Sequence, residues 1–181
     1  EAFDDAPLLR MLEDVAQWIH QNSPTGMIRE QELKDLLASP PRPTPETLAG
    51  RSSEGSNVAS PYLSRRHIDE LMRVLSNDIG VLAPRGPAMF GFTVHSIQEY
   101  LVGRRLARGD VAAIADTIHS HLDDTRYREP ILMALGVISV ERQGDLSKVI
   151  TRLLELDDHF GDLLPRSALM VIAAFDDLVS Y

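Results

Sequence analysis

His95 stands where the sequence pattern of a strand gives way to that of a helix. Upstream, Phe90 and Phe92 alternate with smaller or polar residues, as in a half-buried strand, and His95 falls on the side away from the core. Downstream, Ser96 and Glu99 have the spacing of a capping box, which predicts a helix that begins behind Ser96. The N–H groups and dipole at such a helix end favour anions, above all phosphates. His95 is therefore the candidate for a phosphate contact.

The other clusters of polar residues do not have the spacing of a metal site or a catalytic site. His119 and His121 lie two residues apart, which sets them about 200° apart around a helix, so they cannot converge on one metal ion. Asp157-Asp158-His159 is a weaker cluster of the same kind. The sequence has no cysteine, no zinc-ligand spacing, no nucleophile paired with a base and no Gly-x-x-x-x-Gly-Lys-Ser/Thr loop. We expect neither a metal site nor ATP hydrolysis by this chain alone.

Two further features are assigned to structure. Arg65 and Arg66 open a predicted helix beside Asp69 and Glu70, which is typical of a solvated, salt-bridged face. Gln98 and Glu99 are assigned to capping and packing, because no partner group for a catalytic acid is evident nearby.

Residues 1–108 are predicted to form a helical domain with one two-stranded β-hairpin. Asp5 and Ser64 are candidate caps, and Gly80 ends the third helix. The three helices carry apolar residues at helical spacing: Leu8, Leu12, Val15 and Ile19; Leu33, Leu36 and Leu37; Ile68, Leu71, Met72, Leu75 and Ile79. Strands at Val81-Leu82 and Ala88–Val94 should flank a turn at Pro84–Pro87, and Met27-Ile28 is too short for more than a token strand. Three helices followed by a hairpin are typical of a winged helix.

The segment 39–61 differs from its surroundings. It holds five prolines and five serines, with few large apolar side chains. Such a composition cannot bury enough surface to offset its ordering entropy, so we expect a mobile loop.

Residues 109–181 are predicted to be helical throughout. Helix starts are expected near Asp110, Thr125, Asp145 and Pro165, with Asp110 and Asp145 as caps. The predicted apolar faces are Val111, Ile114, Ile118 and Leu122; Tyr127, Ile131, Leu135 and Ile138; Leu146, Val149, Ile150 and Leu153; Ala168, Ile172 and Phe175. Short connections favour antiparallel packing. The predicted fold class is thus mainly α: a winged helix followed by an antiparallel, solenoid-like helical array.

The charge is unevenly distributed along an acidic chain. The net charge is −9, with 12 Lys and Arg against 14 Asp and Glu in residues 1–108, and 6 against 13 in residues 109–181. A generic nucleic-acid binder has a basic face, so this balance argues against one. The apolar run Ala168–Phe175 is far too short to span a bilayer. Because the chain begins with Glu and lacks cysteine, we expect an excised piece of a longer cytoplasmic protein.

The residues around His95 also resemble a known signature. Phe92, His95, Gln98, Glu99, Tyr100 and Leu101 are similar to Phe-x-His-x-(Thr/Ser)-x-Gln-Glu-(Tyr/Phe)-(Leu/Phe)-Ala-Ala, which closes the winged-helix domain of NACHT-type STAND ATPases. These are P-loop signalling switches that include NOD-like receptors and bacterial antiviral proteins. Val102-Gly103 stands where the family often has two alanines, and both residues keep the position small. The resemblance covers Asp78–Arg108 most clearly.

The resemblance implies a role for the whole protein. In that family the histidine reaches the β-phosphate of bound ADP and holds the inactive state, a role that carries over to His95. It implies ADP or ATP with Mg in the intact parent, although no cofactor is expected in this chain alone. It also implies an upstream NTPase domain, downstream sensor repeats and oligomerisation on activation, in immunity or regulation, without nucleic acid or membrane as partners.

Two alternatives remain open at this stage. One is a winged-helix DNA-binding transcription regulator with a helical dimerisation domain. The other is a helical protein–protein interaction adaptor that uses the acidic helices.

Overall fold

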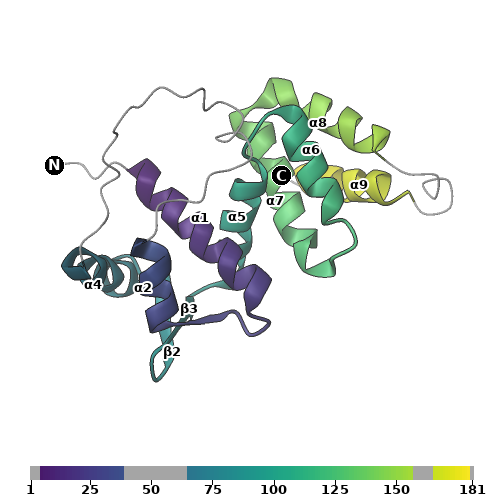
Figure 1. Ribbon diagram of the computed structural model, residues 1–181. Coiled ribbons are helices and arrows are strands. Elements are labelled where there is room, and N and C mark those ends of the chain that lie inside the picture. The colour runs from purple at the N-terminus through teal and green to yellow at the C-terminus, as the bar shows by residue number, and fades with distance from the viewer. Residues whose placement is uncertain (1–4, 39–64, 157–164, 180–181) are drawn as a thin grey trace, which may run out of the picture. The chain divides into compact units, whose positions relative to one another are not determined.

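The structure is a computed structural model that describes residues 5–38, 65–156 and 165–179. It is mainly helical with a small antiparallel sheet (Figure 1). Contacts divide the chain into two compact units, Glu1–Gln98 and Glu99–Tyr181, and the division falls within helix α5 (His95–Leu106). The sequence had suggested a boundary after Arg108. The segment 39–61, the proposed cap Ser64 and the Asp157-Asp158-His159 cluster lie outside the described residues.

The first unit combines three helices with the sheet. The helices are α1 (Asp5–Asn22), α2 (Glu30–Ala38) and α4 (Arg65–Arg73), which continues into the π-helical turn η1 (Val74–Asp78). The strands are β1 (Met27–Arg29), β2 (Leu82–Gly86) and β3 (Met89–Phe92). Helix α2 lies between the strands and the other two helices. The core consists of apolar residues from all of these elements: Leu12, Val15, Ile19, Ile28, Leu33, Leu37, Ile68, Leu71, Met72, Leu75, Leu82 and Phe92.

The sheet has three strands rather than the predicted two. Its order is β1-β3-β2, and both pairs are antiparallel. Met27 lies opposite Gly91 and Ile28 opposite Phe90, so the short segment that we had considered a token strand joins the open edge of β3. A lone hairpin is marginally stable, and the third strand buries Ile28 against the helices.

The hairpin turn lies further along the chain than predicted. Pro84 and Arg85 belong to β2, and Pro87-Ala88 connect the strands, with Ala88 in the left-handed region at φ 54°. Pro84 is tolerated because β2 is an edge strand, where a missing N–H breaks no ladder. The predicted strand Ala88–Val94 is also too long, because β3 ends at Phe92 and Val94 is exposed.

One predicted core residue of the third helix is exposed. Ile68, Leu71, Met72 and Leu75 are buried as expected, but Ile79 is 57% exposed. The chain passes through η1, where the Ile79 amide bonds to the Val74 carbonyl five residues back. This wider turn shifts the α-helical phase on which the prediction relied. Gly80 then ends the helix with φ 70°, as predicted.

The second unit is helical. Its elements beyond α5 are α6 (Val111–Ser120), the 3-10 turn η2 (Thr125–Tyr127), α7 (Arg128–Glu141), α8 (Gln143–Glu155) and α9 (Arg166–Val179). α6 and α7 pack on α8, and α9 packs on α7 and α8. The Asp110 carboxylate caps α6 by accepting from the Ala113 amide at 2.8 Å, as predicted. In the part of the chain that the structure describes, no helix combines the length and apolarity needed to cross a membrane.

Asp145 does not cap α8, because the helix begins at Gln143. Instead its carboxylate accepts from Arg142 and Lys148. The Lys148 ammonium, followed by the Arg142 guanidinium, lowers the pKa of this carboxyl below its ordinary value. Arg142 also donates to the Gly109 carbonyl at 2.6 Å, so it joins the start of α8 to the residues before α6.

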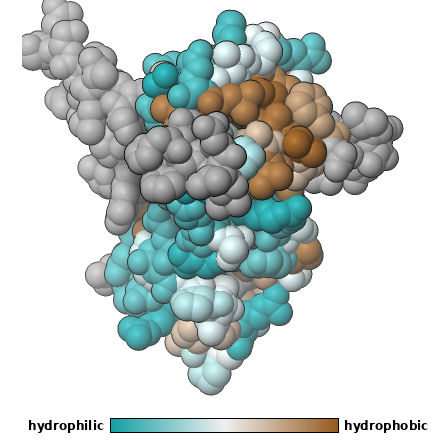
Figure 2. All heavy atoms as spheres, turned by 90° about the vertical axis from the view of Figure 1, so that its right-hand side faces the viewer, coloured by the Kyte–Doolittle hydropathy of each residue, from teal (hydrophilic) through white to brown (hydrophobic). Residues whose placement is uncertain are grey.

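The predicted core face of α9 is wrong. Ser167, Val171 and Ala174 are buried, whereas Ile172 and Phe175 are exposed together with Leu169. The helix is apolar on both sides, and α7 and α8 contact only one of them. Figure 2 shows a patch of apolar surface, in brown, on the face that it draws.

Candidate functional site

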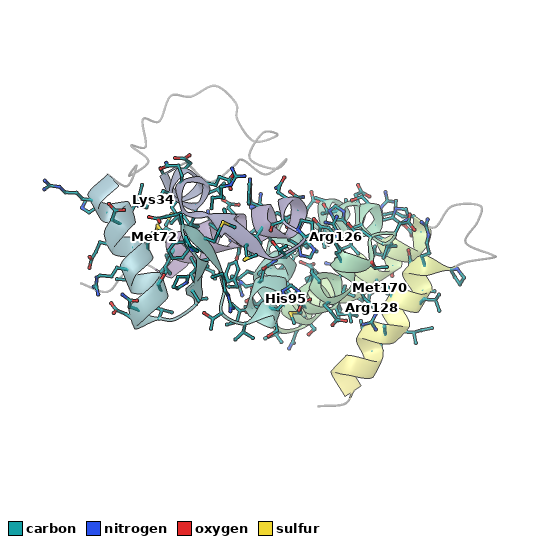
Figure 3. All side chains as sticks on the ribbon, turned by 90° about the horizontal axis from the view of Figure 1, so that it is seen from below. Lys34, Met72, His95, Arg126, Arg128 and Met170 are labelled. Carbon is teal, nitrogen blue, oxygen red and sulfur yellow. The ribbon has the colours of Figure 1, made fainter. Side chains whose placement is uncertain are left out.

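Helix α5 begins at His95, two residues earlier than predicted. His95, labelled in Figure 3, is its exposed first residue, and Ser96 lies inside the first turn rather than ahead of it. The predicted cap at Ser96 is therefore wrong. The chain already turns at Thr93 and Val94, because the Thr93 amide donates to Val81 O and its hydroxyl to Gly80 O at 2.6 Å.

Arg85 crosses from β2 toward this junction. Its Nη2 donates to the Phe92 carbonyl at 2.8 Å and to the Thr93 carbonyl at 3.0 Å. The side chain passes over Gly91, where an added Cβ would lie 3.4 Å from Arg85 Cγ and only 2.8 Å from the Gly26 carbonyl oxygen. Gly91 thus lets Arg85 and the Gly26 backbone approach β3 closely. The guanidinium is held at the end of β3, just before α5 begins.

Gln98, one turn into α5, is a buried amide. It is 2% exposed. Its Oε1 lies 3.8 Å from the position that a Cβ on Gly26 would occupy. Its side chain forms no hydrogen bond to another described residue, and its polar atoms are not sealed off from solvent.

These side chains line one pocket of about 440 Å³ in the first unit. It is bordered by the turn before β1, the end of β3 and the start of α5, through residues that include Thr25, Met27, Arg85, Thr93, His95 and Gln98. None of the residues that line it, all within the described ranges, carries a carboxylate. In a chain of net charge −9, a pocket with an arginine, a histidine, hydroxyls and a helix start but no acid suits an anion.

The signature residues divide into two groups. Phe92, His95 and Gln98 line the pocket, and Phe92 is also a core residue. Ser96, Glu99 and Tyr100 do not line it. The Tyr100 hydroxyl accepts from Arg104 Nη1 at 3.3 Å, and the same nitrogen donates to Glu141 at 2.5 Å. Arg85 was missed, because its segment was interpreted as a turn.

A second pocket in the same unit is electrostatically balanced. It has a volume of about 290 Å³ and lies between α2, α4 and the sheet, near Lys34 and Met72 (Figure 3). The Lys34 ammonium pairs with Glu30 and with Asp69, each at 2.8 Å. Glu70 pairs with Arg73. The carboxylates that we expected to offset Arg65 and Arg66 are therefore paired with other residues.

His119 and His121 are the histidines that the structure describes in the second unit. Within the described ranges, no cluster of three His, Asp or Glu residues could hold a metal ion. The Nε2 of His119 is buried without a partner in the described part of the chain. The His121 ring stacks on Tyr127 with ring centroids 3.9 Å apart.

Comparisons with known proteins identify no relative. No protein-family model matches this chain, and no curated protein and no solved structure is significantly similar to it.

Proposed function

We propose that this chain is the regulatory module of a NACHT-type STAND signalling ATPase. Residues 1–108 act as a winged-helix domain that folds back on an ADP-bound upstream NTPase domain, and residues 109–181 begin a helical array that relays a signal from downstream sensor repeats. The chain itself catalyses nothing, and the ADP, ATP and Mg belong to the intact parent.

The fold supports this proposal in its element order. α1, β1, α2, α4, β2 and β3 follow one another with the sheet order β1-β3-β2, which agrees with a winged helix. The packing of α6, α7, α8 and α9 on one another agrees with the start of a helical array.

The observation that carries the proposal is the position of His95. It is an exposed residue at the start of α5, beside a pocket without carboxylates. A charge-assisted hydrogen bond from histidine to a phosphate contributes about 1.5–3 kcal/mol. This energy shifts a two-state equilibrium by about 10- to 150-fold, which is enough to hold a switch in its inactive state.

Oligomerisation of the intact parent tests the proposal. We expect His95→Ala to raise the oligomeric fraction in the absence of signal, because the ADP-bound state loses a contact. His95→Gln should have a smaller effect, since its amide can still donate a hydrogen bond. Ser96→Ala is the matched control, as Ser96 is the exposed neighbour that does not line the pocket. If all three variants assemble like the wild type, as judged by light scattering, the proposal is wrong.

A further inference from the structure

Arg85, which lines the same pocket as His95, has N–H donors that its hydrogen bonds to the backbone do not use. A guanidinium carries five N–H donors in a planar fork. The two bonds of Arg85 to the Phe92 and Thr93 carbonyls both come from Nη2, which leaves Nε and Nη1. Among the described residues, no carboxylate lies within ion-pair distance of Arg85, whereas Arg73, Arg104, Arg126, Arg128, Arg142, Arg152 and Arg166 each have one.

Gln98 supplies a second, independent observation. Its amide is nearly fully buried, borders the same pocket and has no side-chain hydrogen bond to any described residue. The polar atoms of this amide are not sealed off from the pocket, so a ligand there can form hydrogen bonds with them.

The pocket chemistry selects the class of ligand. Its volume of about 440 Å³ is that of a small-molecule pocket, and its polar lining consists of cationic, hydroxyl and amide groups without a carboxylate. Arginine binds phosphate oxygens through two parallel N–H bonds, which gives both affinity and orientation. A cation would meet the Arg85 charge and find no acid there.

We infer that Arg85 and Gln98, together with His95, form a diphosphate-binding pocket within this chain, in which Arg85 is the main phosphate-binding residue. The anion preference rests on the pocket itself, and the choice of a diphosphate rests on the proposed function. Arg85 holds the phosphate oxygens with Nε and Nη1, while Nη2 stays on the backbone carbonyls and fixes the guanidinium. The Gln98 amide donates to the same anion from the opposite element, α5.

The test is titration of the 181-residue chain with inorganic pyrophosphate, followed by calorimetry at about 0.15 M salt, where weak surface attraction is screened. The wild type should bind, and Arg85→Gln should weaken binding at least ~10-fold. Arg66→Gln is the matched control, because it removes the same charge from an exposed site on α4. Equal weakening by both variants, or no binding by the folded wild-type chain, would overturn the inference.

Gln98→Met is a second test variant, which keeps the inference testable if Arg85→Gln does not fold. Methionine matches the size of glutamine, and the lost amide had no partner, so the unfolding midpoint should stay constant or rise. Pyrophosphate affinity should nevertheless fall several-fold. A variant with unchanged affinity would show that Gln98 plays no part in binding.

The two proposals fail differently. If pyrophosphate binds through Arg85 but His95→Ala leaves assembly of the intact parent unchanged, the pocket binds an anion that does not control the switch. If His95→Ala releases the switch but pyrophosphate does not bind this chain, the regulatory function stands without an Arg85 site.

Discussion

At the scale of single residues, the side chains around the start of α5 have separate tasks. Phe92 is 4% exposed and belongs to the core of the first unit, although it also borders the pocket. His95 is exposed at the same junction. Three positions apart, one residue lies in the core and the other lies at the surface beside the pocket. Substitutions at the two positions should therefore affect different measurements.

The first prediction compares these two residues in the chain by itself. Phe92→Ala should cost about 3–5 kcal/mol of unfolding free energy, because it leaves a cavity in the core. His95→Ala should stay within about 0.5 kcal/mol of the wild type, as expected for a surface substitution. Urea unfolding followed by circular dichroism measures both. A large loss for His95→Ala would mean that the residue is structural.

The sequence was informative about His95 because its signal is local. The spacing of apolar residues changes from that of a strand to that of a helix within a few residues, and this change placed His95 at a strand-to-helix junction. Arg85 could not be found in this way, because its role depends on strand register. Only when β2 extends through Gly86 does Arg85 cross over Gly91 and reach the Phe92 carbonyl. The unbonded state of Gln98 depends likewise on tertiary packing.

At the scale of elements, close contacts between helices decide which small residues are required. An added Cβ on Gly103 of α5 would lie 2.7 Å from the Pro130 carbonyl oxygen and 2.9 Å from Met133 Cβ, both in α7. Gly136, inside α7, has nothing within 4 Å of such an atom. The contact between α5 and α7 therefore requires glycine at position 103.

The second prediction uses this pair of helical glycines. Gly103→Ala should lower the unfolding free energy by about 1–3 kcal/mol, because the obstructing atoms belong largely to the backbone and cannot move aside. Gly136→Ala should instead raise it by about 0.5–1 kcal/mol through the better helix propensity of alanine. Thermal unfolding of both variants checks this. Equal effects would show that α5 and α7 are not in close contact.

The third prediction concerns acid sensitivity at the end of α6. Burial lowers the pKa of His121 below its ordinary value of 6.5, and the Asp124 carboxylate opposes this only in part. The unfolded chain therefore takes up the proton more readily than the folded one. The stabilising contribution of His121 is complete above the unfolded value, and it is lost as the pH falls through the lower folded value.

His121→Phe keeps the stacking on Tyr127 but removes the titration. Between about pH 7.5 and about pH 5.5 the variant should lose less unfolding free energy than the wild type, as urea titrations at both values would show. The same loss in both proteins would mean that His121 does not resist protonation.

The sequence predicted where helices form. It predicted which side of a helix is buried only where a single side is apolar. α6 and α7 bury the residues expected of them, including Ile114, Ile118, Ile131 and Leu135. α9 does not, because it carries apolar residues on two sides and periodicity cannot say which side meets α7. Ile79 was misplaced for a different reason, since the π-helical turn before it has no signature in the pattern used.

At the scale of the whole molecule, the acidic balance argues against a polyanionic partner. The net charge is −9, and the Lys34 and Arg73 charges near α4 are neutralised by carboxylates. Duplex DNA binding depends on phosphate neutralisation by a basic face. A DNA-binding regulator is therefore the less favoured alternative.

The fourth prediction follows from this balance. The chain should show no appreciable binding to duplex DNA at physiological salt, because the protein and the nucleic acid repel each other. Fluorescence anisotropy with a labelled duplex measures it. Submicromolar binding that weakens steeply as salt is added would support the regulator instead.

The most direct test of the account is the rate of ADP release from the intact parent protein. Fluorescent ADP is loaded, displaced with excess unlabelled ADP, and followed for the wild type, His95→Ala and His95→Gln. Loss of one histidine–phosphate bond should accelerate release by about 10- to 150-fold in His95→Ala, with His95→Gln between that variant and the wild type. Identical release rates in all three proteins would contradict the proposed role of His95.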